Sequence, residues 1–346
     1  PDNPELREEA ARAAMDEGQY QACSTILENH ASTDGQRHML ALAWLHQGRL
    51  DQARDLLSTL SASHPQDTSL KFNLAYVSAL KADYALAESL LDEQTLESVP
   101  AASPLKLRVL HHQHKLEEAL VLAAGLTSHL PPGSQAYGIA ATIALDADQF
   151  ELAGRYAKQA PDIPESQTVI GYLALEANDD RTAFEMFETA LASVPESGRA
   201  WVGKGLAHLL SEDLPRATSD LGKGASLLRT HAGSWIAAGW ASLLGGNLQE
   251  AAERMKMAIE SSPSFAEAHG SLAVVRCQEG RLESARQHCE IALRLDPQCM
   301  SGAMALSLLS EQAGEPEKAG RILQDALRRR LGPRGLSIAR LVARRG

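Results

Sequence analysis

Aromatic residues and cysteines are scarce in this chain, and long apolar runs are missing from it. Aromatic residues make up 4% of the 346 positions. The four cysteines, Cys23, Cys277, Cys289 and Cys299, form no CxxC pair and are too few for a disulfide framework. No run of about 18 apolar residues occurs, so we expect no membrane-spanning helix. These absences exclude a disulfide-stapled scaffold and a membrane-spanning helix in this chain.

Catalytic motifs are also missing. The sequence contains no GxxxxGK[ST], GxGxxG, GxSxG or HExxH motif, which argues against phosphate-loop, dinucleotide, esterase and zincin chemistry. The histidines His111, His112 and His114 suggest a metal site, but no third and fourth ligand stand at matching spacing, and we interpret them as a solvated helix end. We therefore predict no enzyme, no catalytic residue, no cofactor and no metal.

Acidic residues outnumber basic ones along most of the chain, and arginines are concentrated at its C-terminal end. The formal net charge is −11, and residues 328–346 hold seven arginines and no acidic residue, which leaves −18 on the preceding residues. A general nucleic-acid binder would have a basic surface, so we do not expect one. The arginines suit the solvent side of a final helix, and we expect residues 332–346 to form a basic capping helix; a basic partner-binding tail is the alternative.

What the sequence does contain is a recurring hairpin-turn motif. It consists of a small or turn-forming residue, one further residue, a large apolar residue, two more residues and a small residue. Its ten copies end at Cys23, Ala53, Ala87, Ala119, Ala153, Ala183, Ala217, Ala251, Ala285 and Ala319. The last five copies follow one another at intervals of 34 residues, whereas the earlier intervals are 30, 34, 32, 34 and 30. Such a period predicts a repeat protein, which can exceed the roughly 250–300 residues of a single core.

Prolines and small residues follow the motif in phase. A proline stands twelve residues after five of the ten motif ends, where it would stop the second helix of the hairpin. These prolines are Pro65, Pro131, Pro195, Pro263 and Pro297. A second small residue follows seven places after the motif end, as Ala190 follows Ala183, and two such positions allow antiparallel helices to approach closely.

This pattern resembles the tetratricopeptide repeat family, whose 34-residue unit has Trp, Leu, Gly, Tyr, Ala, Phe and Pro landmarks. Trp201 with Gly205, Trp235 with Gly239, and Phe187 match those landmarks. The sequence departs from the pattern where the family has an aromatic residue in the first helix. That place is taken by His208, Ser242 and Arg276.

The resemblance implies an all-α protein, a right-handed superhelical α-solenoid of antiparallel helix hairpins. We expect one array over residues 1–346, with irregular repeats in 1–163 and regular 34-residue repeats in 164–331. The short interval around Pro161 and Pro164 predicts a local kink in the superhelix. The chain begins with Pro1 and has no signal-peptide pattern near it. We therefore expect a fragment or a processed form that lacks its targeting signal, which leaves the bacterial cytoplasm and the periplasm open as locations.

The resemblance also implies that the first helix of each unit lines a concave groove. We locate the candidate partner-binding residues by counting eleven residues back from each motif end. Neighbours three or four residues away lie on the same helix face and are included. The candidates are Tyr76, Tyr172, Val202, Leu206, Ile236, Trp240, Val274, Met304 and Leu308. The stripe carries no ionisable group in its later half, and Leu209, Leu210, Leu243 and Leu244 extend it. The alternative is that packing between adjacent units covers these side chains.

Some members of the family grip a C-terminal carboxylate with cations on three successive first helices. Asn73 stands at a plausible position for such a clamp, but the neighbouring His38 and Leu42 do not supply the cations. We do not expect a chaperone-tail clamp.

We therefore predict a scaffold or adaptor that binds a protein or peptide segment in its groove, within a bacterial secretion, pilus or exopolysaccharide assembly by analogy with other members. Two alternatives remain open: a structural spacer that forms a homo-oligomer through the apolar stripe, and a regulatory fragment of a larger enzyme.

Overall fold

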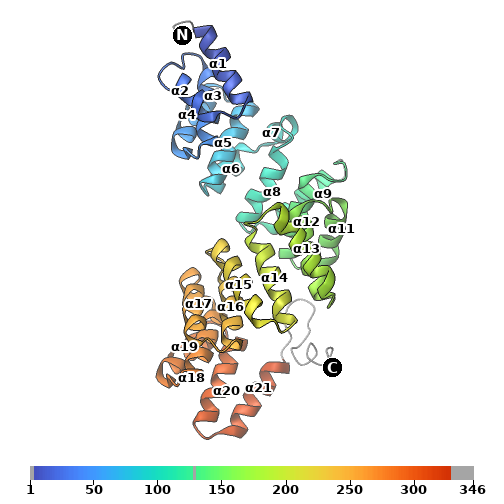
Figure 1. Ribbon diagram of the computed structural model, residues 1–346, viewed down its shortest axis with the longest axis vertical. Helices are drawn as coiled ribbons and strands as arrows, with labels where there is room; N and C mark the ends of the chain where they lie inside the picture. Colours follow the sequence, from blue (N-terminus) through green and yellow to red (C-terminus); the bar gives the residue numbers. More distant parts are fainter. Residues whose placement is uncertain (1–3, 128–129, 329–346) are drawn as a thin grey trace. The chain divides into compact units, whose positions relative to one another are not determined.

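The fold is a succession of helix hairpins. The computed structural model describes residues 4–127 and 130–328, and these residues form 21 α-helices and no β-strand (Figure 1). They divide into two compact units, which meet in the sequence at Ala160 and Pro161. Among the described residues, no helix combines the length and apolar character needed to cross a bilayer. The prediction of an all-α solenoid of hairpins is confirmed, whereas the proposed capping helix at 332–346 lies outside the described residues.

The first unit contains five hairpins of uneven helix length and one additional short helix, α7 (Glu93–Ser98). The hairpins are α1 (Pro4–Asp16) with α2 (Tyr20–Leu27), α3 (Asp34–His46) with α4 (Leu50–Ser63), α5 (Thr68–Leu80) with α6 (Tyr84–Leu90), α8 (Ala102–His112) with α9 (Leu116–Thr127), and α10 (Gln135–Asp146) with α11 (Phe150–Gln159). The second helices of this unit range from 7 to 14 residues.

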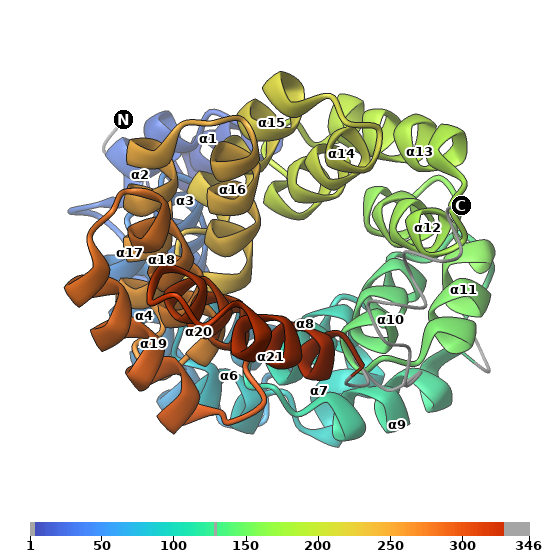
Figure 2. The ribbon, with the colours of Figure 1, turned by 90° about the horizontal axis from the view of Figure 1, so that it is seen from below.

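The second unit contains five nearly identical hairpins. They are α12 (Pro164–Glu176) with α13 (Asp180–Ser193), α14 (Gly198–Leu210) with α15 (Leu214–Leu228), α16 (Ala232–Leu244) with α17 (Leu248–Ser261), α18 (Ala266–Gln278) with α19 (Leu282–Leu295), and α20 (Met300–Gln312) with α21 (Pro316–Arg328). Every first helix here has 13 residues. Within this unit, Figure 2 shows α12, α14 and α16 on the inner side of a curved row and α13, α15 and α17 on its outer side.

The hairpin turn has one conformation in all ten hairpins. The first residue of each sequence motif adopts a left-handed conformation, with φ between 57° and 80°. The next residue donates its backbone N–H to the carbonyl five residues before it, at 2.7–3.0 Å, which closes a Schellman motif. The second helix then begins at the third residue of the motif, for example at Leu50, Leu248 and Leu282. The recurring motif is therefore a helix stop followed by a helix start.

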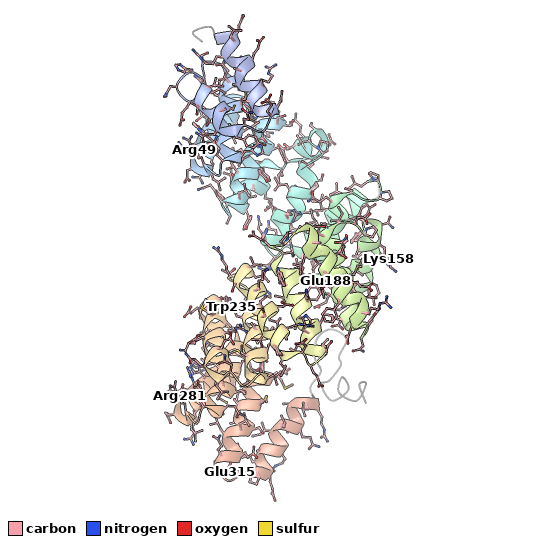
Figure 3. All side chains as sticks on the ribbon, viewed as in Figure 1. Arg49, Lys158, Glu188, Trp235, Arg281 and Glu315 are labelled. Atoms are coloured by element: carbon pink, nitrogen blue, oxygen red, sulfur yellow. The ribbon has the colours of Figure 1, made fainter. Side chains whose placement is uncertain are left out.

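The last residue of each motif lies at the contact between the two helices of a hairpin. All ten of these small residues are buried, nine of them completely and Ala319 with 6% exposure. The prolines predicted to stop the second helices lie just beyond them: α13 ends at Ser193 before Pro195, and α17 ends at Ser261 before Pro263. Exposed charged side chains such as those of Lys158, Arg281 and Glu315 project from the edge of the ribbon (Figure 3).

Side-chain sizes are matched where two helices cross. A Cβ atom on Gly205 would lie 2.6 Å from Cγ of Leu221, and one on Gly239 would lie 2.6 Å from Cε of Met255. Glycine is therefore required opposite these large side chains. In the next hairpin the equivalent of the glycine is Ala273, and it packs in one cluster with the smaller Cys289.

All four cysteines are free and buried. Burial raises the pKa of the Cys289 thiol to about 11, and burial raises that of Cys299 to about 12. Cys299 also caps α20, because its Sγ accepts the backbone N–H of Gly302 at 3.2 Å. These thiols pack as small apolar side chains.

The left-handed turn residue yields a first prediction. Ala82 has φ 59°, a conformation that costs an L-residue about 1 kcal/mol relative to glycine. We expect Ala82→Gly to raise the free energy of unfolding by about 1 kcal/mol, whereas Ala79→Gly, inside α5, lowers it by about 1 kcal/mol. Urea unfolding followed by circular dichroism measures both, and a loss of stability in Ala82→Gly would contradict the assigned turn.

A second prediction concerns the contact between successive hairpins. A Cβ atom on Gly270 of α18 would lie 2.4 Å from the backbone nitrogen of Gly302 in α20. We expect Gly270→Ala to destabilise the protein by about 1–3 kcal/mol, because the two backbones must move apart. The control is Gly320→Ala in α21, where the Cβ has no neighbour within 4 Å and helix propensity favours alanine. Similar unfolding midpoints for the two variants would refute the close approach.

Candidate partner-binding surface

The first helices of the second unit present a row of incompletely buried apolar side chains. We call this row the apolar face. It comprises Leu206, Leu209 and Leu210 of α14, Ile236, Trp240, Leu243 and Leu244 of α16, and Met304 and Leu308 of α20. All are half-buried except Leu244, whose exposure is 57%. Apolar surface left open in this way is typical of an interaction site.

The members of the apolar face pack on three successive core clusters, and α18 contributes no open apolar side chain to the face. Leu206 and Leu209 pack on the cluster around Leu221. Trp240 and Leu243 belong to the border of two clusters, one shared with Ile236 and the other shared with Met304 and Leu308. The first helices of successive hairpins also contact one another along this unit. The row thus follows the stacking direction of the hairpins.

Trp240 is held in place by a chain of hydroxyl groups. Its Nε1–H donates to Oγ of Ser271 in α18 at 3.0 Å, and Ser271 donates to Oγ of Ser301 in α20 at 3.1 Å. The carboxylate of Glu267 accepts the backbone N–H groups of Met300 and Ser301, at 2.7 and 3.1 Å. The indole is therefore oriented by two following hairpins, which leaves it less freedom to lose when a partner binds.

Two of the predicted binding residues lie in the core. Val274 is 1% exposed and packs between α18, α19 and α20, and Val202 is 9% exposed. Their side chains offer almost no surface to a partner in this structure. The physical reason for Val274 is the close contact at Gly270, which brings α20 against the side of α18 that carries Val274.

The two tyrosines predicted for the groove have different surroundings. Tyr172 is half-buried, donates its hydroxyl to the carbonyl of Arg199 at 2.9 Å and packs edge-on against Phe187 at 5.3 Å between ring centroids. Tyr76 is 41% exposed and stacks on Phe72. Tyr76 lies in the first unit, whereas the other eight predicted residues lie in the second.

Polar residues replace the expected aromatics of the first helices, and each has a polar partner. Nε2 of His208 lies 3.5 Å from Asp220, and the imidazole packs on Phe184. Burial lowers the pKa of His208 and raises that of Asp220, so desolvation outweighs their mutual attraction. Arg276 pairs with Glu279 within the same hairpin.

The third replacement, Ser242, belongs to a bridge between hairpins. The guanidinium of Arg254 donates to Oγ of Ser242 at 2.9 Å and to the carbonyls of Thr218 and Ala238 at 3.2 and 3.0 Å. Glu250 pairs with the same guanidinium at 2.7 Å. Arg254 of α17 thus connects α15 and α16, a role that the sequence analysis missed because nothing in the repeat pattern marks this position.

The other candidate sites serve structural contacts. Nε2 of His111 lies 2.7 Å from Asp146, and His112 stacks on Tyr84. In residues 4–127 and 130–328, no group of three or more metal-binding side chains comes together. Asn73, considered for a carboxylate clamp, is hydrogen-bonded to His38 at 2.8 Å.

Comparison with known families identifies the repeat. A model of the tetratricopeptide repeat matches residues 38–103, 168–225 and 236–298, which together are more than half of the chain. The chain belongs to the tetratricopeptide repeat family. The resemblance noted in the sequence is confirmed, and most of the apolar face lies within the matched repeats. Tetratricopeptide repeats typically form non-catalytic surfaces for protein interaction.

Two solved structures are similar to the chain. The hetero-tetramer Cut9–Hcn1 of the APC/C is similar over 94% of this chain and 87% of its own, with a TM-score of 0.50 and 12% identity. MamA is similar over 46% of this chain and 92% of its own, with a TM-score of 0.39 and 21% identity. At 12% identity the likeness to Cut9–Hcn1 concerns the fold alone. No curated protein sequence matches the chain.

The division of the repeat surface into core and open side chains yields a third prediction. We expect Val274→Ala to lower the free energy of unfolding by about 2 kcal/mol, because it removes fully buried methyl groups and leaves a cavity. Leu244→Ala should change it by less than about 0.5 kcal/mol. Unfolding in urea checks both, and equal effects would mean that Leu244 is covered in solution.

Proposed function

We propose that this protein is a non-catalytic scaffold that binds an apolar segment of a partner protein on the apolar face of its second unit. The observation that supports the proposal is Leu244, which exposes 57% of its surface at the end of α16 beside the half-buried Leu243 and Trp240. Leucine and tryptophan side chains left in contact with water lower the free energy of binding when a partner covers them.

The chemistry of the apolar face favours an apolar segment over a charged one. None of its nine side chains is ionisable, so the face itself offers no counter-charge to a charged group that a partner would bury there. The indole of Trp240 already uses its N–H on Ser271, and the face therefore offers dispersion contacts and apolar area. A short helix or strand with two or three large apolar side chains fits these requirements.

The test uses Leu244→Asp, which places a charge on the face without removing a core contact. The matched control is Val121→Asp on α9, because Val121 is 76% exposed but lies in the first unit. Partners are captured from an extract with the wild-type chain and quantified by mass spectrometry, and the affinity of the principal partner is then measured by calorimetry. We expect Leu244→Asp to weaken binding at least tenfold and Val121→Asp to weaken it less than twofold.

Full affinity in Leu244→Asp would overturn the proposed site. Light scattering on the same variants tests the alternative of self-association, since a wild-type dimer that dissociates in Leu244→Asp would show that a second copy covers the face. The setting inferred from the family resemblance, a bacterial secretion, pilus or exopolysaccharide assembly, predicts that the captured partner is a component of such an assembly.

A further inference from the structure

Two tryptophans occupy the same position in neighbouring hairpins of the second unit. Trp201 and Trp235 are 34 residues apart, at the start of α14 and α16. Each donates its indole N–H to the carbonyl six residues earlier, Trp201 to Pro195 and Trp235 to Arg229, both at 2.8 Å. The two rings thus have equivalent backbone anchors, and their surroundings can be compared position by position.

The indole of Trp201 is already occupied by cations of its own chain. Nζ of Lys223 lies 3.7 Å from the ring centroid, and Nζ of Lys204 lies 5.6 Å from it. Both distances are within the range of a cation–π interaction, in which the negative face of the ring attracts the ammonium group. The repeat therefore provides a place where a lysine side chain binds beside a tryptophan.

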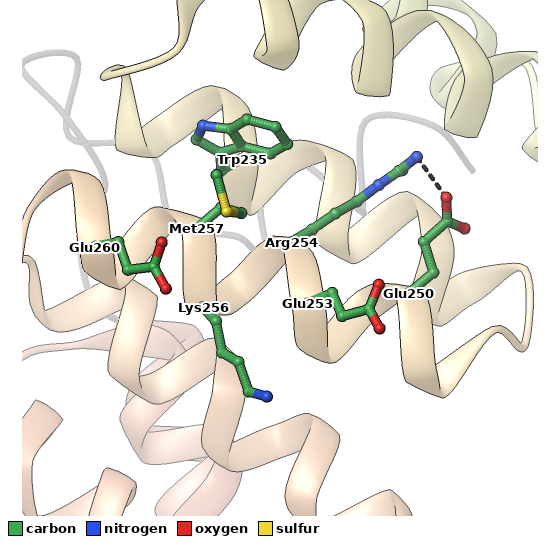
Figure 4. A pocket seen from close by; sticks show the side chains of 7 residues that line it. All are labelled: Trp235, Glu250, Glu253, Arg254, Lys256, Met257 and Glu260. Atoms are coloured by element: carbon green, nitrogen blue, oxygen red, sulfur yellow. Dashed lines mark hydrogen bonds and ion pairs between the residues drawn. The ribbon is translucent and has the colours of Figure 1, made fainter.

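The equivalent place beside Trp235 has lost both cations. Residues 34 positions after Lys223 and Lys204 are Met257 and Ala238, neither of which carries a charge. Met257 is 40% exposed and lies below the indole in Figure 4. The apolar side chain of Met257 therefore lies beside the indole of Trp235, in the place that the ammonium group of Lys223 takes beside Trp201.

Negative charge has been gained around the same ring. Glu253 and Glu260 stand 34 residues after Ser219 and Ser226, so two carboxylates replace two hydroxyl groups. Both glutamates are exposed, and in the described part of the chain neither has an ion-pair partner. One cation is also gained, since Lys256 stands 34 residues after Gly222. Two cations lost and two carboxylates gained outweigh it, so the net change favours a cation from outside.

These side chains line one shallow, open pocket of about 440 Å³ on α17, with Trp235 contributed by α16 (Figure 4). Five of the lining residues besides Trp235 and Met257 are charged: Glu250, Glu253, Arg254, Lys256 and Glu260. Arg254 is neutralised by Glu250, and the ammonium group of Lys256 points away from the indole (Figure 4). Glu253, Glu260 and Lys256 therefore leave one net negative charge on the lining, from two carboxylates and one ammonium group.

We propose that this pocket is a second interaction site, which receives a lysine side chain from a basic segment of a partner protein. The aliphatic stem of the lysine packs on Trp235 and Met257, and its ammonium group lies over the indole, on the surface of α17 that carries Glu253 and Glu260. The internal pair of Lys223 and Trp201 is the model for this contact. The site is distinct from the apolar face, which carries no charge and includes Trp240.

The test uses fluorine NMR of the full chain labelled with 5-fluorotryptophan, in which each of the four tryptophans gives its own signal. The probe is a ten-residue peptide of alternating lysine and serine, and its control is the same peptide with every lysine acetylated. We expect the signal of Trp235 to shift saturably with the lysine peptide and to stay unchanged with the acetylated one. The signal of Trp201 should stay unchanged with both peptides, because Lys223 already occupies its ring.

A pair of double variants separates this site from general attraction to an acidic protein. Glu253→Gln with Glu260→Gln should weaken the peptide affinity about threefold to tenfold. Glu283→Gln with Glu290→Gln removes the same charge from exposed positions of α19 outside the pocket and should weaken it less than twofold. The proposal is overturned if the Trp235 signal does not move, if Trp201 or Trp240 moves equally, or if both double variants have the same effect.

Discussion

The close approach of two helices at a small residue is the constraint on which the rest of this structure depends. Each motif end is a buried alanine or cysteine, and glycines such as Gly205 and Gly239 stand opposite the large side chains of the second helix. Because these contacts bring the helices of a hairpin close together, each hairpin is a thin layer that cannot enclose a core of its own. Its remaining apolar side chains must be covered by the neighbouring hairpins.

Stacking covers these side chains incompletely on the side of the first helices. Successive first helices contact one another directly, yet Leu206, Trp240 and Leu308 remain half-buried and Leu244 remains exposed. Polar links fix the stacking where aromatic residues would otherwise fill space. Arg254 joins three helices through backbone carbonyls and Ser242, and Ser271 joins Trp240 to the following hairpins. Such directional bonds favour one arrangement of the hairpins over sliding alternatives.

The regular 34-residue period also allows equivalent positions of different hairpins to be compared. Positions 34 residues apart share a backbone environment, so a difference in side chain at such positions reflects a difference in contacts. At Trp201 the chain supplies Lys223, and at Trp235 it supplies Met257, with Glu253 and Glu260 nearby. Side-chain size also differs at equivalent positions: Gly239 packs against Met255, and in the next hairpin Ala273 packs against the smaller Cys289. Side-chain charge and side-chain size thus differ from hairpin to hairpin within one repeated framework.

The sequence by itself determined the hairpins. A residue in a left-handed conformation, a helix-starting residue two places later and a buried small residue three places after that are local features, and local features repeat with the period. Only the tertiary structure decided which residues of the predicted stripe are open. Val274 and Trp240 stand at the same repeat position, but the glycine contact of α18 with α20 covers the first, while the second remains half-buried. Exposure depends on the size of side chains in the neighbouring hairpin, and a helix period does not contain that information. For the same reason the pocket at Trp235, assembled from two helices, could not be located by counting along one of them.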